Sequence, residues 1–247
     1  MPQLPTDEQA LENLRQARRR VDRSQDFFIG LYQTPLAYAL APWLIRRHVR
    51  PNTVTVWMIL SGILAAGLIA LPSRITLILG AAVIQLFMLF DYADGAVARA
   101  TGQLSTYGRE LDSLAHLIGH PLMMVAFTLA LVRLGEAPTL WTVALGGVYG
   151  MLEMCSRTLV EMDAVVALRA GAADAPSPVK PLSPKWWAKY IVDFFIIFPN
   201  FAMVFPWVLV VDAFAGTRVA IVYMALGAAL TALMLLRSVL KRLKQFV

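Results

Sequence analysis

Six stretches of the sequence each have nearly the length and apolarity that a membrane-spanning helix needs. They lie at about 53–72, 75–97, 106–132, 138–162, 188–212 and 218–240. About 20 apolar residues cross the core of a bilayer, where a helix satisfies all of its own backbone groups. The chain is 58% hydrophobic and only 15% charged, with a mean hydropathy of +0.63. We therefore expect an all-α integral membrane protein with six transmembrane helices.

The region before the first of these stretches is basic. Residues 6–24 have an amphipathic helical pattern that contains Arg15, Arg18, Arg19, Arg20 and Arg23. A basic amphipathic helix binds the surface of an anionic membrane, although a solvated basic tail would have the same composition. Residues 27–45 are apolar but are interrupted by Pro35 and Pro42. We expect an interfacial or half-inserted helix there.

These patterns divide the chain into three parts. We expect a cytoplasmic amphipathic and interfacial helical segment at 1–49, the six-helix transmembrane domain at 50–240, and a cytoplasmic basic tail at 241–247. Within the domain, residues 166–187 are rich in Ala, Gly and Pro. Such a composition is typical of a loop.

The basic residues also indicate an orientation in the membrane. If both termini lie in the cytoplasm, every Lys and Arg except Arg74, Arg133 and Arg218 falls on the cytoplasmic side. The positive-inside rule describes this bias, and it accounts for the net charge of +6 without a nucleic-acid partner. We expect a protein of the bacterial inner (cytoplasmic) membrane, with the junction of the second and third spans at the cytoplasmic face.

Three carboxylates and a histidine lie at that junction. Asp91 and Asp94 are three residues apart near the end of the second span, and Asp112 and His116 are four apart in the third. Side chains at these spacings share a helix face, so two antiparallel helices would gather them in one pocket. Acids that merely line a hydrated helix end are the alternative. Like charges so close together favour a bound cation, and oxygen ligands suit Mg²⁺ or Mn²⁺ with a phosphate partner.

The order of residues around these acids resembles a known signature. It is the signature of the CDP-alcohol phosphotransferase (CDP-alcohol phosphatidyltransferase) family, Asp-x2-Asp-Gly-x2-Ala-Arg-x8-Gly-x3-Asp-x3-Asp. The matching residues are Asp91, Asp94, Gly95, Ala98, Arg99, Gly108 and Asp112. The segment from Arg50 to Thr55 also resembles the Pro-Asn-x-x-Thr element of that family.

The resemblance implies a membrane enzyme of phospholipid biosynthesis. Such enzymes transfer a substituted phosphate from a CDP-linked donor to an alcohol or polyol hydroxyl and release CMP. It implies divalent metal ions, two of Mg²⁺ or Mn²⁺ in the family, with Asp91, Asp94 and Asp112 as ligands. It places CMP among Asn52, Thr55, Gly95, Ala98, Arg99 and Gly108. It also suggests a homodimer.

His116 stands where the signature has its last Asp, and three interpretations compete. His116 could be the catalytic base, because imidazole, with a pKa of about 6.5, suits proton transfer near neutral pH. Alternatively, the site binds nucleotide and metal without turnover, because the second ion has lost a carboxylate ligand. A third interpretation is that another group takes the proton, with Glu110 and His120 the nearest candidates.

The donor and the acceptor are less constrained. CDP-diacylglycerol is the favoured donor, and a CDP-amino alcohol with a lipid acceptor remains open. Arg157 could bind an anionic acceptor, because guanidinium grips phosphate in a bidentate manner. An ion pair with Glu153 or Glu161, each four residues away, explains Arg157 equally well. A cation transporter could also use the Asp cluster, but it would have no need of the small residues beside it.

Overall fold

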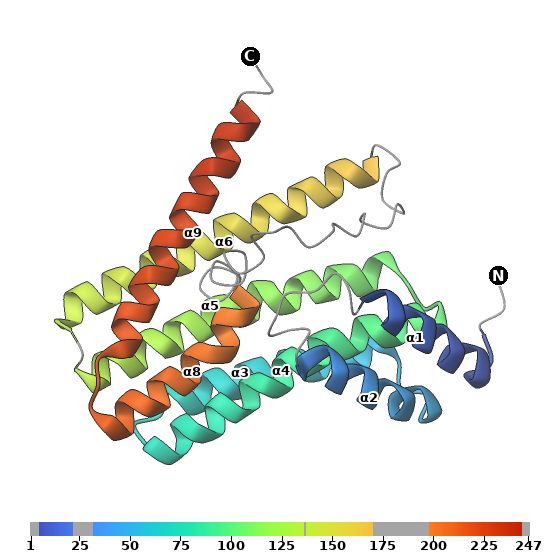
Figure 1. Cartoon of the computed structure of the whole chain (residues 1–247), viewed down its shortest axis with the longest axis horizontal. Coiled ribbons are helices and arrows are strands. Elements are labelled where there is room, and N and C mark those ends of the chain that lie inside the picture. The colour runs from blue at the N-terminus through green and yellow to red at the C-terminus, as the bar shows by residue number, and fades with distance from the viewer. Residues whose placement is uncertain (1–4, 22–31, 136, 170–197, 244–247) are drawn as a thin grey trace.

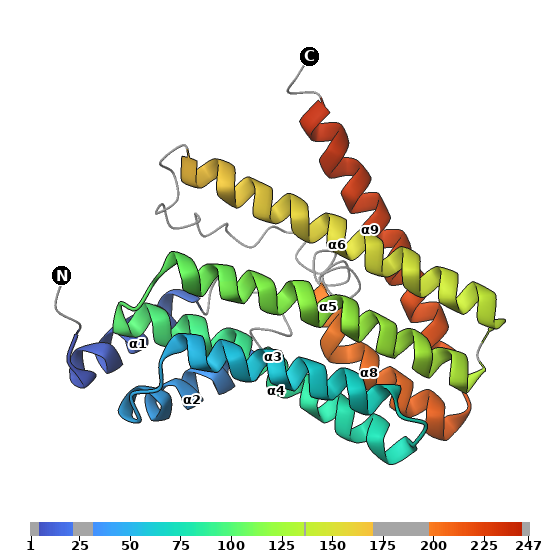
Figure 2. The same ribbon diagram turned by 180° about the vertical axis from the view of Figure 1, so that it is seen from behind.

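The computed structural model describes residues 5–21, 32–135, 137–169 and 198–243, and these are helical apart from short connections. The described helices are α1 (Asp7–Val21), α2 (Thr34–Arg46), α3 (Pro51–Ala70), α4 (Arg74–Thr101), α5 (Thr106–Leu134), α6 (Thr139–Arg169), α8 (Phe198–Ala215) and α9 (Val219–Leu243). Figure 1 shows α3, α4 and α5 side by side, with α1 and α2 at one end and α9 rising away. The view from behind in Figure 2 shows the same arrangement.

A proline, a serine and a glycine mark the ends of α3 and α4. Pro51 lies in the first turn of α3, where its missing N–H is harmless. Ser73 caps α4 by accepting a hydrogen bond from the backbone nitrogen of Ile75 at 3.2 Å. The break between α3 and α4 at residues 71–73 thus falls where the first two predicted spans meet. α4 ends at Gly102, which has a φ of +68° that favours glycine.

Phe87 of α4 is fully buried where α3, α4 and α5 meet. A Cβ atom on Gly62 of α3 would lie 2.9 Å from the Phe87 ring, and one on Gly119 of α5 would lie 3.0 Å from it. Only glycine lets both helices approach the ring this closely. Small residues serve the same purpose at many helix contacts within membranes.

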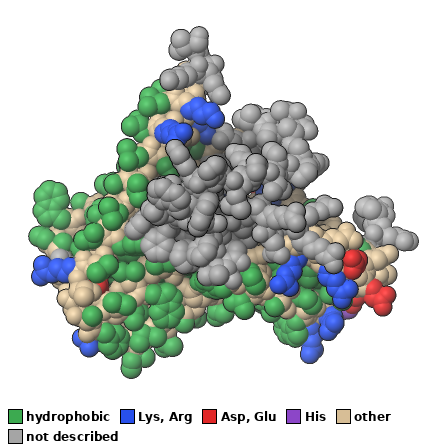
Figure 3. Space-filling view, in the orientation of Figure 1, with side chains coloured by type: hydrophobic (Ala, Val, Ile, Leu, Met, Phe, Trp, Pro, Cys, Tyr) green, Lys and Arg blue, Asp and Glu red, His purple; other side chains and the backbone are tan. Residues whose placement is uncertain are grey.

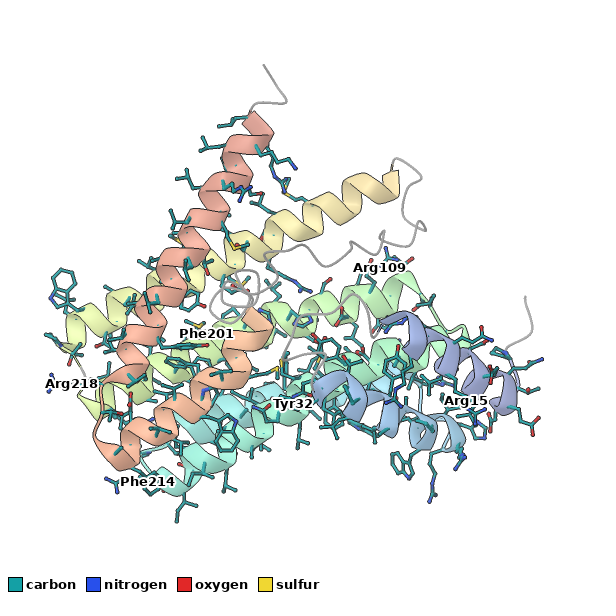
Figure 4. All side chains as sticks on the ribbon, viewed as in Figure 1. Arg15, Tyr32, Arg109, Phe201, Phe214 and Arg218 are labelled. Atoms are coloured by element: carbon teal, nitrogen blue, oxygen red, sulfur yellow. The ribbon has the colours of Figure 1, made fainter. Side chains whose placement is uncertain are left out.

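Aromatic rings join the second half of the chain to α5. The ring of Phe127 on α5 lies 5.0 Å from Phe205 of α8. Phe201 of α8 stacks on Tyr223 of α9 at 5.4 Å and meets Tyr149 of α6 edge-on at 4.8 Å. Figure 4 labels Phe201 beside α8. These buried contacts hold α6, α8 and α9 against the first helices.

The N-terminal helices pack on α4. Ala10 and Leu14 of α1 are buried, and the Asn13 side chain donates a hydrogen bond to the carbonyl of Ala100 at 3.2 Å. The helices predicted within 6–24 and 27–45 are therefore confirmed as α1 and α2, while residues 22–31 lie outside the described part. Contact of α1 and α2 with a membrane surface stays a prediction.

Four of the described helices, α3, α4, α5 and α9, are long and apolar enough to cross a membrane. α8 is a shorter apolar helix, and α6 has 31 residues. Large apolar side chains are exposed on the long helices, for example Leu60, Leu64, Ile75, Val125 and Leu236. Figure 3 shows hydrophobic side chains over the α4 and α8 side and Lys and Arg near α1 and α2. An integral membrane protein is supported, and six spans stay a prediction.

The helix boundaries differ from the predicted ones in the second half of the chain. α6 continues to Arg169, beyond the expected end at 162 and into the segment predicted as a loop. No Gly or Pro interrupts the sequence between 151 and 170, so the residues after 162 can continue the helix. α8 begins at Phe198, and residues 188–197 of the predicted span lie outside the described part.

Arg133 joins the end of α5 to the end of α3. Its Nη1 donates a hydrogen bond to the carbonyl oxygen of Ala70 at 2.6 Å, and its Nη2 donates one to that of Ile69 at 2.5 Å. Carbonyls in the last turn of a helix have no partner within the helix. Arg133 therefore supplies the hydrogen-bond donors that the last carbonyls of α3 lack within the helix.

We predict that Arg133→Met lowers the melting temperature of the purified protein by several degrees, because charged donors to such carbonyls contribute about 1.5 kcal/mol or more. Thermal unfolding in detergent, followed by Trp fluorescence, measures this. Arg218→Met at the exposed start of α9 is the matched control. Equal melting temperatures for the two variants would contradict the assignment.

Candidate active site

A short connection between α4 and α5 positions the acidic residues. After Gly102 ends α4, the backbone nitrogen of Gln103 donates to the carbonyl of Ala98 at 3.0 Å. The Ser105 hydroxyl then caps α5 by accepting a hydrogen bond from the backbone nitrogen of Gly108 at 2.9 Å. The two caps reverse the chain within four residues, so the acid-bearing ends of α4 and α5 lie side by side.

Asp91 of α4 and Asp112 and His116 of α5 form one group. The Nε2 atom of His116 lies 3.0 Å from Oδ1 of Asp91 and 3.5 Å from Oδ1 of Asp112. One ligand atom from each of the three lies within 4.8 Å of the others. His116 is buried, and both carboxylates are partly buried. The expectation that the two helix faces meet is therefore confirmed.

Asp94 has a different partner. Its Oδ2 atom accepts a hydrogen bond of 2.6 Å from the hydroxyl of Thr55 on α3, and both side chains are buried. One oxygen of Asp94 is thus engaged by α3. The structure places Asp94 beside the group of Asp91, Asp112 and His116, with Thr55 holding it in position.

A cleft of about 450 Å³ opens between α3, α4 and α5. Its lining includes every residue expected around the nucleotide, namely Asn52, Thr55, Gly95, Ala98, Arg99 and Gly108. Asp94 and Asp112 line it as well. The structure therefore brings the two sequence elements, from α3 and from the α4–α5 region, to one cavity.

Glycine is required at two points of this cleft. A Cβ atom on Gly108 would lie 3.0 Å from Oδ1 of Asn52 and 3.1 Å from Oγ of Ser105. A Cβ atom on Gly95 would lie 3.0 Å from Nη1 of Arg99. The Arg99 guanidinium thus lies against Gly95, and no ion pair of Arg99 with an acid occurs among the described residues.

Five further lining residues were not singled out from the sequence, namely Gln103, Leu104, Ser105, Thr106 and Arg109. Ser105 had a recognisable signal, because a Ser three residues before the first turn's free N–H is a typical helix cap. Arg109 had none beyond its charge. Figure 4 labels it at the start of α5.

A second histidine continues the group toward α6. Nδ1 of His116 lies 3.1 Å from Nε2 of His120, and Nδ1 of His120 lies 3.8 Å from Oε1 of Glu153. All three side chains are buried. His120 is therefore a hydrogen-bonded partner of His116 and does not line the cleft, and Glu110 is exposed at the protein surface.

Arg157 lies one helical turn beyond Glu153 on α6. It interacts electrostatically with Glu153, His116 and His120. This supports the pairing with Glu153 that the spacing predicts, while the side chain of Glu161 lies outside the described part.

Comparison with known proteins identifies the family of this chain. The model of the CDP-alcohol phosphatidyltransferase family matches residues 48–242. The chain belongs to this family. It is similar to phosphatidylinositol phosphate synthase of Streptomyces avermitilis, with 37% identity over 89 residues. That match covers 36% of each chain, so it spans about a third of the relative.

CDP-alcohol phosphatidyltransferases use a CDP-linked donor, an alcohol acceptor and divalent metals, and the donor atoms present suit a metal ion. Two ligands at right angles around an ion, each about 2.1 Å away, are separated by about 3.0 Å. The contacts of His116 with Asp91 and Asp112, at 3.0 and 3.5 Å, are close to that separation. This group could therefore hold one divalent ion.

We predict that Gly108→Ala weakens CMP binding about fivefold, equal to roughly 1 kcal/mol, because the added methyl displaces Asn52 or Ser105. Isothermal titration of the purified protein measures this. Gly67→Ala on α3 is the matched control, because nothing lies within 4 Å of its Cβ position. A similar loss of affinity in both variants would contradict the role of Gly108.

Proposed function

We propose that this protein is a membrane transferase of phospholipid biosynthesis. It transfers the phosphatidyl group of CDP-diacylglycerol to the hydroxyl of an alcohol and releases CMP. The observation that carries the proposal is the single cleft in which both nucleotide elements lie beside the carboxylate–histidine group. Family membership supports the reaction class.

The residues of the cleft divide the work between binding and chemistry. Gly95 and Gly108 leave space for the nucleotide because they have no side chain, and Asn52 places its amide at the wall of the cleft. Arg99 braces the phosphates with a charge-assisted hydrogen bond. Asp91, Asp112 and His116, with Asp94, would hold a divalent ion. Such an ion, when bound, neutralises the charge that develops on the reacting phosphate.

The acceptor hydroxyl must lose a proton as its oxygen attacks phosphorus. His116 is the base predicted from the sequence, but its Nδ1 contacts His120 and its Nε2 faces two carboxylates. Its side chain is only 8% exposed, whereas that of Asp112 is 38% exposed and lines the cleft. Asp112 is the better placed, and we propose it as the proton acceptor.

The relative's name supports the choice of donor and suggests an acceptor class. A phosphatidylinositol phosphate synthase forms a phosphatidyl ester of a phosphorylated polyol. We propose that the acceptor here also carries a phosphate and that Arg157 binds it. Support comes from the charge of Arg157 near His116, which places a guanidinium on the α6 side of the site.

The proposed orientation places the cleft at the cytoplasmic face, where nucleotides are available. Figure 4 supports it, because Arg15 and Arg109 lie at one end of the molecule and Arg218 at the other. The end with Arg15 also carries the basic N-terminal helices. Positive charge concentrates on the cytoplasmic side of membrane proteins. A homodimer stays an expectation from the family.

We predict metal-dependent CMP release by the purified protein in lipid nanodiscs supplied with CDP-diacylglycerol and polyol phosphates. Asp94→Asn should lower the rate at least 100-fold, because it removes the carboxylate that Thr55 holds at the cleft. Asp7→Asn on α1, an exposed site, is the matched control and should keep the rate. CMP binding without release under every condition would favour the alternative, a relative that binds nucleotide and metal without turnover.

We predict that Arg157→Gln raises the KM for a phosphorylated polyol about tenfold, equal to roughly 1.4 kcal/mol, and leaves the KM for the unphosphorylated polyol unchanged. The two acceptors are compared in the same CMP-release assay. If Arg157 serves only as the ion-pair partner of Glu153, both acceptors will be affected alike. That result would remove Arg157 from the acceptor site.

A further inference from the structure

Two histidines and three acids lie close together in the site, and one ring proton of the histidine pair has two alternative positions there. Two neutral imidazoles carry two ring protons in total. One of these lies in the hydrogen bond between Nδ1 of His116 and Nε2 of His120, 3.1 Å apart. The other lies either on Nε2 of His116 or on Nδ1 of His120. The position of that proton decides whether Nε2 of His116 presents an N–H group or a lone pair to Asp91 and Asp112.

Each end of the histidine pair offers a carboxylate to this proton. At one end Oδ1 of Asp91 lies 3.0 Å from Nε2 of His116. At the other end Oε1 of Glu153 lies 3.8 Å from Nδ1 of His120, which is an ion-pair distance longer than a direct hydrogen bond. Glu153 is buried, so water screens its charge only weakly.

Asp91 and Asp112 would hold a divalent ion beside Nε2 of His116. Its positive charge would disfavour a proton on Nε2 and favour one on Nδ1 of His120, beside Glu153. Nε2 of His116 would then present its lone pair toward the same space as the two carboxylates. In metalloproteins a ligating histidine commonly has its other nitrogen fixed by a partner backed by a carboxylate. Here His120 and Glu153 supply that arrangement.

We infer that His116 binds the divalent ion through Nε2, with His120 and Glu153 holding it in the required tautomer, and that this site prefers first-row transition ions such as Mn²⁺ over Mg²⁺. Mg²⁺ takes oxygen ligands almost exclusively, whereas imidazole is a common ligand of transition metals. The inference rests on the proposed function only in that the carboxylates hold an ion. It assigns His120 and Glu153 as positioning residues for His116.

The first test is the ligand itself. Mn²⁺ is added to the metal-free, full-length protein in detergent, pulsed EPR records nitrogen hyperfine coupling, and competition with Mg²⁺ gives the ratio of the two Kd values. We expect imidazole nitrogen coupling and at least tenfold tighter binding of Mn²⁺. His116→Asp should abolish the coupling and reduce the preference for Mn²⁺ over Mg²⁺ about tenfold. His48→Asn, at an exposed histidine with a φ of +52°, should change neither.

The second test concerns the positioning residues. Glu153→Gln keeps the shape of the side chain and removes its charge. We expect it to weaken Mn²⁺ binding about tenfold. When it is combined with His116→Asp, we expect little further change in Mg²⁺ binding. Glu110→Gln, an exposed acid near the start of α5, is the matched control. Equal Mn²⁺ affinity in wild type and Glu153→Gln would overturn the role of Glu153.

The outcomes separate this inference from the proposed function. Absence of nitrogen coupling in the wild-type protein overturns the inference, whatever the variants do and even if CMP is released. Nitrogen coupling in a protein that releases no CMP supports the inference and overturns the proposed function. Thermal unfolding of each variant is measured alongside, so that a misfolded variant is not scored as a lost ligand.

Discussion

The contact of Phe87 with Gly62 and Gly119 sets the spacing of α3, α4 and α5, and the functional cleft depends on that spacing. The same ring lies edge-on to His116, with centroids 6.1 Å apart. One residue therefore fixes the distance between the helices and one wall of the histidine's pocket. Close packing of this kind leaves little freedom for a larger side chain at either glycine. The hydrogen bond from Thr55 to Asp94 then acts between helices whose separation is already determined.

The histidine at position 116 changes more than the charge of the site. An aspartate there would reach only toward the other acids at the α4–α5 boundary. An imidazole has a second nitrogen on its far side, and that nitrogen connects to His120 and, through it, to α6. The carboxylate–histidine group thereby becomes linked to a helix that contributes no lining residue to the cleft among the described residues. The contacts of His116 with His120 and of His120 with Glu153 thus connect the carboxylate–histidine group to α6.

Much of the cleft was predictable, because its residues lie at helix-face spacings within one short segment. Asp91 and Asp94, three apart, and Asp112 and His116, four apart, carry their geometry in their spacing. The partnership of Thr55 with Asp94, and of His120 with Glu153, could not be predicted in this way. These contacts join residues 39 and 33 positions apart, and they depend on which faces of separate helices pack together. The end of α6 was predicted too early for a local reason, since the Gly and Pro residues that indicate a loop begin only at Gly171 and nothing before it interrupts the helix.

The order of the site residues along the chain has a consequence for biogenesis. The cleft and the carboxylate–histidine group lie within α3, α4, α5 and their connection, between Asn52 and His116. A ribosome inserting this protein into a membrane completes those three helices before α6 begins to emerge. The cleft can therefore assemble while the rest of the chain is still being synthesised. The parts contributed by α6, the link from His120 to Glu153 and the proposed acceptor residue Arg157, must wait, so they are the last to form.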